Sequence, residues 1–140
     1  MSLVFSHVAL NCGDPLVTER FYTTHFGFRR ARVIPLGADQ IVFLKAGSVY
    51  LELFKAAGDS PAPAQEKDGP AYRGVRHIAF QVDDVKAKLA EMGAAANVTL
   101  GPLDFGAFIP GWSTAWVSDP DGNIVEISQG YTDQDNPPSL

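Results

Sequence analysis

The sequence predicts an α+β protein built from two βαβββ modules, and an internal repeat is the main observation behind this prediction. Residues 7–12 (HVALNC) and residues 77–82 (HIAFQV) share one pattern at an offset of 70 residues, from His7 to His77. Both segments alternate with period two, which is typical of a half-buried strand. In each segment the second, fourth and sixth residues are apolar, whereas the first, third and fifth are small or polar.

A helix is expected after each of these two strands. Asp14 and Pro15 form an N-cap followed by proline at the first helical position, and Asp84 repeats the cap at the same offset. Gly27 and Gly93 are typical helix stops. Apolar residues at helical spacing are expected to face the core, namely Val17, Phe21 and Phe26 in the first helix and Val85, Leu89 and Met92 in the second.

The rest of each half reads as strands joined by tight turns. The turns are Ala46-Gly47 in the first half and Asp119-Pro120-Asp121-Gly122 in the second. Strands are predicted at residues 40–44, 48–54, 114–118 and 123–128, with weaker ones near residues 30–35 and 97–100. The predicted organisation is one structural domain with a first module at 1–56, a linker at 57–74, a second module at 75–130 and a tail at 131–140.

Composition excludes several classes of partner. The net charge is −5 and no cluster of Lys and Arg stands out, which argues against nucleic acid and against anionic membranes. No signal peptide or membrane span is visible, so the expected location is the cytoplasm. The single cysteine, Cys12, is expected to be buried in a strand. Residues 101–113 form an aromatic-rich loop that could cover a pocket, anchor in the core or line a dimer interface.

Four residues form the candidate metal site: His7, Glu52, His77 and Glu126. Each glutamate stands in the middle of an apolar strand, where a carboxylate is costly to bury unless it is paired or bound to a metal. The two histidines occupy matching positions in the two repeats. A single such histidine or glutamate is more often structural, but the recurrence as two symmetric pairs favours one divalent metal ion. The third histidine, His25, lies at the end of the first helix and has no assigned role.

The sequence resembles the vicinal oxygen chelate superfamily of glyoxalases, bleomycin-resistance proteins and dioxygenases, through residues 7–11, 21–28, 74–85 and 119–127. The resemblance implies a cupped mixed β-sheet made by the two modules, with helices on its outer face, and often a homodimer. The ligand order His, Glu, His, Glu is similar to that of bacterial glyoxalase I. Two imidazoles and two carboxylates leave two octahedral positions and suit Ni, Zn, Co, Mn or Fe.

This resemblance implies a lactoylglutathione lyase-like metalloenzyme, a lyase or isomerase that transfers a proton through a metal-stabilised enediolate. The substrate would be a small hydroxycarbonyl or thiohemiacetal. Glu126 is the expected base, and Glu52 a ligand or second proton carrier. Two alternatives are an Fe(II) extradiol dioxygenase, disfavoured by the fourth ligand, and a metal-free small-molecule binding protein of the bleomycin-resistance kind.

The sequence departs from the glyoxalase I pattern where that family binds glutathione. Asn11 replaces an arginine four residues after the first histidine, and Ala56 replaces an asparagine four residues after the first glutamate. These departures argue against glutathione as the substrate, unless Arg20, Arg29, Arg30, Arg73 or Arg76 substitutes. The residues expected to line the substrate site are Asn11, Tyr50, Phe54, Gln81, Phe108 and Trp112.

Overall fold

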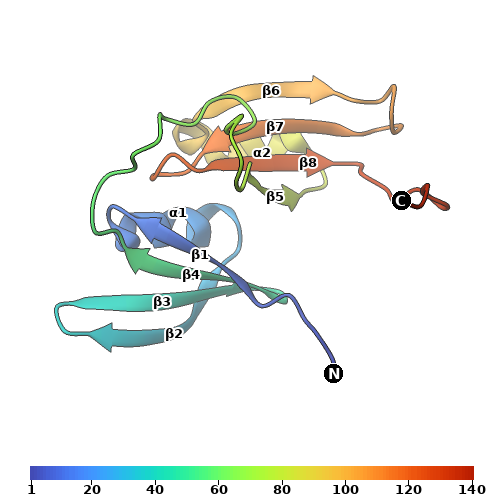
Figure 1. Cartoon of the computed structure of the whole chain (residues 1–140). Helices are drawn as coiled ribbons and strands as arrows, with labels where there is room; N and C mark the ends of the chain where they lie inside the picture. Colours follow the sequence, from blue (N-terminus) through green and yellow to red (C-terminus); the bar gives the residue numbers. More distant parts are fainter. The chain divides into compact units, whose positions relative to one another are not determined.

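Two four-stranded mixed sheets, each accompanied by one α-helix, make up the chain in the computed structural model, which describes all 140 residues (Figure 1). The chain divides into two units, residues 1–64 and residues 65–140. The division falls inside the segment predicted as a linker, and residues 65–74 belong to the second unit. Each unit has the predicted βαβββ order, so the fold class is confirmed.

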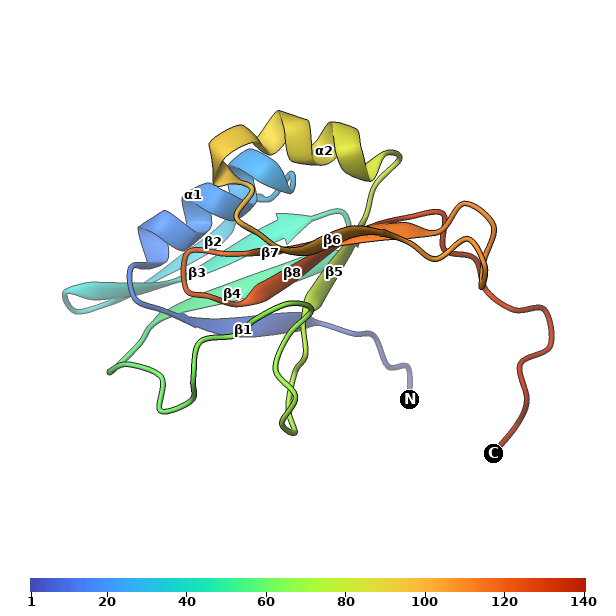
Figure 2. The same ribbon diagram turned by 90° about the horizontal axis from the view of Figure 1, so that it is seen from above.

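The first unit places the strand that carries Glu52 inside its sheet. Its elements are β1 (His7–Cys12), α1 (Pro15–His25), β2 (Arg29–Leu36), β3 (Asp39–Ala46) and β4 (Val49–Lys55). The spatial order is β1-β4-β3-β2, with β1 parallel to β4 and the other pairs antiparallel. The weak strand predicted near residues 30–35 is therefore a full edge strand, β2 (Figure 2).

The second unit repeats this topology. Its elements are β5 (Ile78–Gln81), α2 (Val85–Met92), the 3₁₀ turn η1 (Gly93–Ala95), β6 (Val98–Asp104), β7 (Ser113–Ser118) and β8 (Ile124–Gln129). The order is β5-β8-β7-β6, again with one parallel pair, β5 and β8. Glu126 is therefore inside its sheet, as Glu52 is in the first unit. Neither α-helix is long and apolar enough to cross a membrane.

The predicted helix caps are confirmed, with one correction to the core. The side chain of Asp14 accepts a hydrogen bond from the backbone of Leu16, and that of Asp84 accepts one from Ala87. Val17 is 43% exposed, so its predicted burial is wrong. The buried residues of α1 are Thr18, Phe21 and Tyr22, which lie at positions i, i+3 and i+4 and therefore share one face of the helix.

In the second helix the expected core positions are largely buried. Val85 and Met92 are buried, and Leu89 is half-buried.

Thr18 of the first helix shows why a polar residue was missed as a core position. Its hydroxyl donates to the carbonyl of Asp14 one turn earlier, so burial leaves no polar group unsatisfied.

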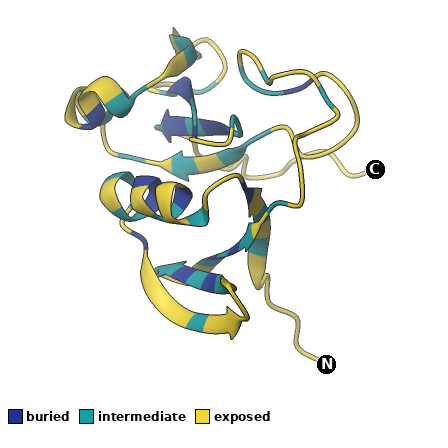
Figure 3. Ribbon diagram, turned by 90° about the vertical axis from the view of Figure 1, so that its left-hand side faces the viewer, coloured by how far each residue is buried: buried dark blue, intermediate teal, exposed yellow.

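The strands that carry the glutamates have one face packed under a helix. Leu51 and Leu53 of β4 are buried and the strand contacts α1, while Glu52 between them is half-buried on the opposite face. Figure 3 shows buried and less buried residues along the ribbon of the chain. In β8 the neighbours Val125 and Ile127 are buried in the same way. The alternation predicted for these strands therefore decides which face each glutamate occupies.

We expect Asp14→Ala to lower the free energy of unfolding by about 0.5–2 kcal/mol, because the alanine cannot accept the hydrogen bond from Leu16 at the start of α1. Urea unfolding followed by circular dichroism measures this difference. Asp14→Asn is the matched control, since an asparagine oxygen can still accept. An equal loss in both variants would show that the cap contributes through its charge and not through this hydrogen bond.

Candidate functional site

His7 and Glu52 form one pair on the face of the first sheet that points away from α1. In the parallel β1–β4 ladder Ala9 is the register partner of Glu52, and His7 lies two residues earlier on the same face. The Nε2 atom of His7 is 2.9 Å from Oε2 of Glu52. The Glu52 side chain is 15% exposed, and the free-energy cost of burying its carboxylate is offset by the imidazole from the neighbouring strand.

Two further residues hold the His7 ring. Phe43 is the antiparallel register partner of Glu52, and its ring meets that of His7 edge to face with centroids 5.6 Å apart. On the other side, Nδ1 of His7 is 2.8 Å from the hydroxyl of Ser6. Because a hydroxyl can donate or accept, Ser6 is compatible with either tautomer of His7.

His77 and Glu126 form the corresponding pair in the second unit. Ala79 is the register partner of Glu126 in the β5–β8 ladder, and Nε2 of His77 is 2.7 Å from Oε2 of Glu126. Trp116 occupies the place that Phe43 has in the first unit, as antiparallel partner of the glutamate. Its indole N–H donates to Oε2 of Glu126 at 3.1 Å, an interaction that a phenylalanine cannot make.

The Nδ1 atom of His77 defines what its other nitrogen can do. Nδ1 is 2.6 Å from the backbone carbonyl oxygen of Asp68, which can only accept, so Nδ1 carries the proton. In the neutral ring Nε2 then presents a lone pair, and it faces the Glu126 carboxylate at 2.7 Å. Two acceptors approach this closely only with a proton or a cation between them. A backbone carbonyl on the remote ring nitrogen is also the usual partner of a metal-binding histidine.

The segment that supplies this carbonyl is anchored by an ion pair. Arg76 donates to Oδ2 of Asp68 from Nη2 at 2.9 Å and from Nε at 3.1 Å, and Nη1 reaches the carbonyl of Pro70. Partial burial raises the pKa of the Asp68 carboxyl, but the hydrogen bonds and charge of Arg76 outweigh it, so the pKa is lowered overall. The carboxylate therefore stays charged, and the segment preceding His77 stays anchored.

Each unit by itself brings two possible metal ligands together. Within either unit no group of three or more His, Cys, Asp or Glu side chains is placed to hold a metal ion. The donor set of each unit, one imidazole nitrogen and one carboxylate, nevertheless fits half of the predicted His₂Glu₂ site. His25 stands apart from these pairs, against the ring of Phe21.

Five of the six residues expected to line the substrate site lie on the faces that carry the glutamates or hydrogen-bond to a residue on them. In the first unit Asn11, Tyr50 and Phe54 share the face of Glu52, and Asn11 is the register partner of Phe54. In the second unit Gln81 is the register partner of Ser128, and the indole of Trp112 donates to the hydroxyl of Ser128. Phe108 is 78% exposed.

Aromatic side chains of the loop predicted at residues 101–113 pack against the face of Glu126. The Phe105 ring is 4.9 Å from that of Trp112 and 6.4 Å from that of Trp116. Trp112 also contacts Tyr131 edge to face at 6.2 Å. Of the three expectations for this loop, anchoring by its own aromatics describes these contacts. Residues 101–104 belong to β6, so the loop itself is shorter than predicted.

Sequence reasoning missed four residues that support the two pairs: Ser6, Phe43, Asp68 and Trp116. Phe43 and Trp116 could have been found from register, since each lies on the strand that hairpins into the strand of its glutamate. Asp68 could not, because its contribution is a backbone carbonyl in a segment without regular structure.

The chain is similar to proteins of one superfamily. A family model described as Glyoxalase/Bleomycin resistance protein/Dioxygenase superfamily matches residues 4–127. Among solved structures, SMU.1112c is 32% identical with a TM-score of 0.67, covering 90% of this chain and 98% of its own. A glyoxalase family protein from Enterococcus faecalis is 29% identical with a TM-score of 0.66 (89% and 96% covered). A lactoylglutathione lyase from Agrobacterium tumefaciens is 27% identical with a TM-score of 0.58 (91% and 93% covered). No curated protein matches the sequence.

Trp116→Phe removes the donor to Glu126, and we expect it to lower the free energy of unfolding by about 1.5–3 kcal/mol, the range for a hydrogen bond to a charged group. Trp112→Phe is the matched control, since it makes the same change of ring where the acceptor is the neutral hydroxyl of Ser128. For this control we expect about 0.5–1.5 kcal/mol. Denaturant titration of the metal-free variants measures both, and equal losses would mean that the carboxylate gains nothing special from Trp116.

Proposed function

Because the chain belongs to the Glyoxalase/Bleomycin resistance protein/Dioxygenase superfamily, we propose that it is a metal-dependent lyase or isomerase of glyoxalase I type. Its substrate would be a small hydroxycarbonyl or thiohemiacetal. The observation that carries the proposal is the pair of matching His–Glu contacts, 2.9 Å in one unit and 2.7 Å in the other. In this proposal His7, Glu52, His77 and Glu126 together bind one divalent ion of the Ni, Zn, Co, Mn or Fe group.

The proposal requires both His–Glu pairs at one ion. Two ligands from one unit would leave most coordination positions to water, whereas four protein ligands give a defined octahedral site with two open positions. The pairs can be supplied by one chain or by two chains of a homodimer, and the proposal covers both arrangements. Exposed apolar residues before β1, Leu3, Val4 and Phe5, support an association between chains.

When bound, the ion would supply Lewis acidity toward the substrate oxygens. The chain's own residues would hold and move the proton. Glu126 is the proposed base: its Oε2 is occupied by Trp116 and His77, so Oε1 is the oxygen left to take a proton from one carbon and return it to the next. Glu52, with Phe43 instead of tryptophan beside it, is a ligand or second proton carrier.

One observation favours a second function, a metal-free small-molecule binding protein. Phe105, Trp112, Trp116 and Tyr131 form a continuous series of ring contacts on the face of Glu126, which could stack on a planar ligand. A metal-free binding function does not account for the two His–Glu pairs. An Fe(II) dioxygenase is disfavoured, because four protein ligands would occupy a position needed for oxygen or substrate.

We expect protein purified without added metal to carry, or to take up on titration, one divalent ion per site. Glu52→Gln and Glu126→Gln should each weaken metal binding by at least about tenfold, since each replaces a charged ligand by a neutral one. Elemental analysis and calorimetric titration measure stoichiometry and affinity, and Glu91→Gln on the exposed part of α2 is the control. A wild-type protein that holds no metal and gains none would leave only the binding function.

With metal bound, we expect turnover of the methylglyoxal–glutathione adduct or of a related hydroxycarbonyl, with proton exchange at the reacting carbon. Glu126→Gln, assayed at saturating metal, should lower kcat by about 10²–10⁴-fold, the usual contribution of a general base. Solvent deuterium incorporation followed by NMR measures the exchange directly. Oxygen uptake with catechols and Fe(II), without such exchange, would instead indicate a dioxygenase.

A further inference from the structure

Three positive side chains share the Glu52 face of the first sheet. Lys45 lies two residues along β3 from Phe43, the register partner of Glu52, and therefore faces the same side. On the edge strand β2, Arg29 is the register partner of Lys45 and Arg32 is the register partner of Phe43. The three side chains thus line the outer part of the face that carries the His7–Glu52 pair.

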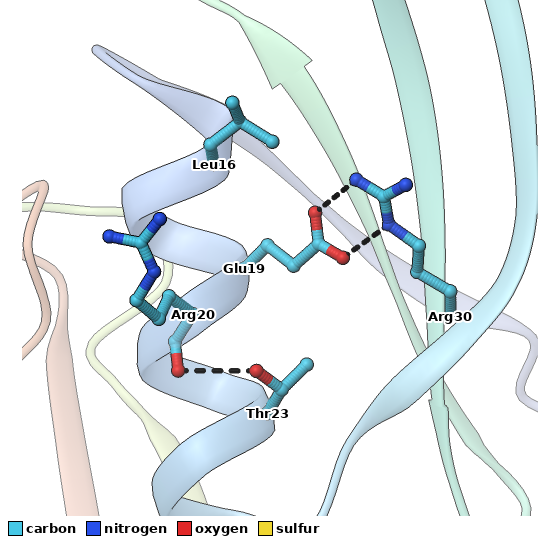
Figure 4. A pocket seen from close by; sticks show the side chains of 5 residues that line it. All are labelled: Leu16, Glu19, Arg20, Thr23 and Arg30. Carbon is cyan, nitrogen blue, oxygen red and sulfur yellow. Dashed lines mark hydrogen bonds and ion pairs between the residues drawn. The ribbon is translucent and has the colours of Figure 1, made fainter.

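A β-bulge places Arg32 on this face. In a regular strand Arg30 and Arg32 would point to the same side, but the register shifts between them, and Ala31 is left without a partner. Arg30 is opposite Leu44, on the helix side, where it forms a two-pronged ion pair with Glu19 of α1 (Figure 4). Bulges re-aim side chains in this way and are frequent beside functional sites.

These three cations have no ion-pair partner. The carboxylate of Glu19 is taken by Arg30, and that of Glu52 by His7. The remaining carboxylate on this face, Asp39, lies at the other end of β3. Lys45 instead lies over the Tyr50 ring, with Nζ 5.2 Å from the centroid. Arg29 and Arg32 are exposed, and Lys45 is half-buried.

The charge of the chain is unevenly divided between the units. Residues 1–64 carry six Lys and Arg against five Asp and Glu, whereas residues 65–140 carry five against eleven. The first unit is therefore slightly positive in an acidic protein, and half of its cations lie on the Glu52 face. Unpaired cations gathered on one face attract an anion more than they stabilise a sheet.

We propose that Arg29, Arg32 and Lys45 form an anion subsite for a carboxylate or phosphate group. Lys45 is diagonal to Glu52, about 7–8 Å away at the backbone, and Arg32 is two strands from it, about 10 Å at the usual strand spacing. An anion held there would lie about 7–10 Å from Glu52, a separation that one small molecule can span. The two guanidinium groups offer planar pairs of donors that match carboxylate and phosphate oxygens.

That this anion is part of the substrate rests on the proposed function, and it identifies the substrate as an acidic hydroxycarbonyl. The existence of the subsite does not depend on the metal. Its anion-binding residues also differ from the two positions, Asn11 and Ala56, at which the glutathione contacts of glyoxalase I are missing.

The test is an NMR titration of the ¹⁵N-labelled full chain, with chelator present, using inorganic phosphate in one arm and succinate in the other. We expect saturable shifts at the amides of Arg29, Arg32 and Lys45 in at least one arm, and the tighter arm names the anion. The double variant R29Q/R32Q should weaken that binding by about tenfold, the loss expected for a hydrogen bond to a charged group. K45Q should weaken it by a smaller factor.

Lys55→Gln is the matched control, since it removes one positive charge from the same unit on the opposite face of β4. It should leave the affinity within about twofold. The subsite is refuted if neither anion gives saturable shifts at these amides, or if K55Q weakens binding as much as R29Q/R32Q does. Anion binding without any metal binding or turnover would refute the proposed function alone.

Discussion

The cost of a carboxylate in the middle of a buried strand governs the arrangement of both units. Glu52 and Glu126 each stand between residues that must pack under a helix, so strand alternation fixes the face on which the carboxylate emerges. Neither glutamate is fully exposed there. Glu52 is met by the imidazole of His7, the first residue of the parallel neighbour strand, and Glu126 by that of His77, the residue before its parallel neighbour strand. The parallel pairing of first and last strand in each module is what brings histidine and glutamate together.

Much of this arrangement could be predicted from the sequence, because it follows from local periodicity and from repetition. The caps at Asp14 and Asp84, the helix stops and the order of strands depend on residues close together in the chain. The symmetry of the two glutamates could be recognised because the repeats keep it. Val17 was placed wrongly because Thr18, a polar residue, takes the buried position by satisfying its hydroxyl within the helix.

What could not be predicted depends on backbone geometry between distant segments. The Asp68 carbonyl that fixes the proton of His77 could be any residue by its side chain, so no residue type marks it. The sequence Arg-Arg-Ala-Arg does not indicate the bulge in β2 either, although this bulge places Arg30 and Arg32 on opposite faces of the sheet. Trp116 is buried, at 6% exposed, and only its register beside Glu126 shows that its N–H is a partner of the carboxylate.

The same frame has been used differently in the two units. In the second unit, Asp68 contacts His77 through its backbone carbonyl, and Trp112 of the aromatic loop donates to Ser128 on the face of Glu126. Glu126 itself is held from two sides by Trp116 and His77. In the first, the glutamate has one polar partner, and the face around it ends in exposed cations. A carboxylate that is held tightly suits a group whose position must not change during proton transfer. A more open face with positive charge suits recognition of an anionic ligand. Two copies of one module can therefore divide positioning and recognition between them, because the sheet fixes only where the His–Glu pair lies and leaves the rest of the face free to vary.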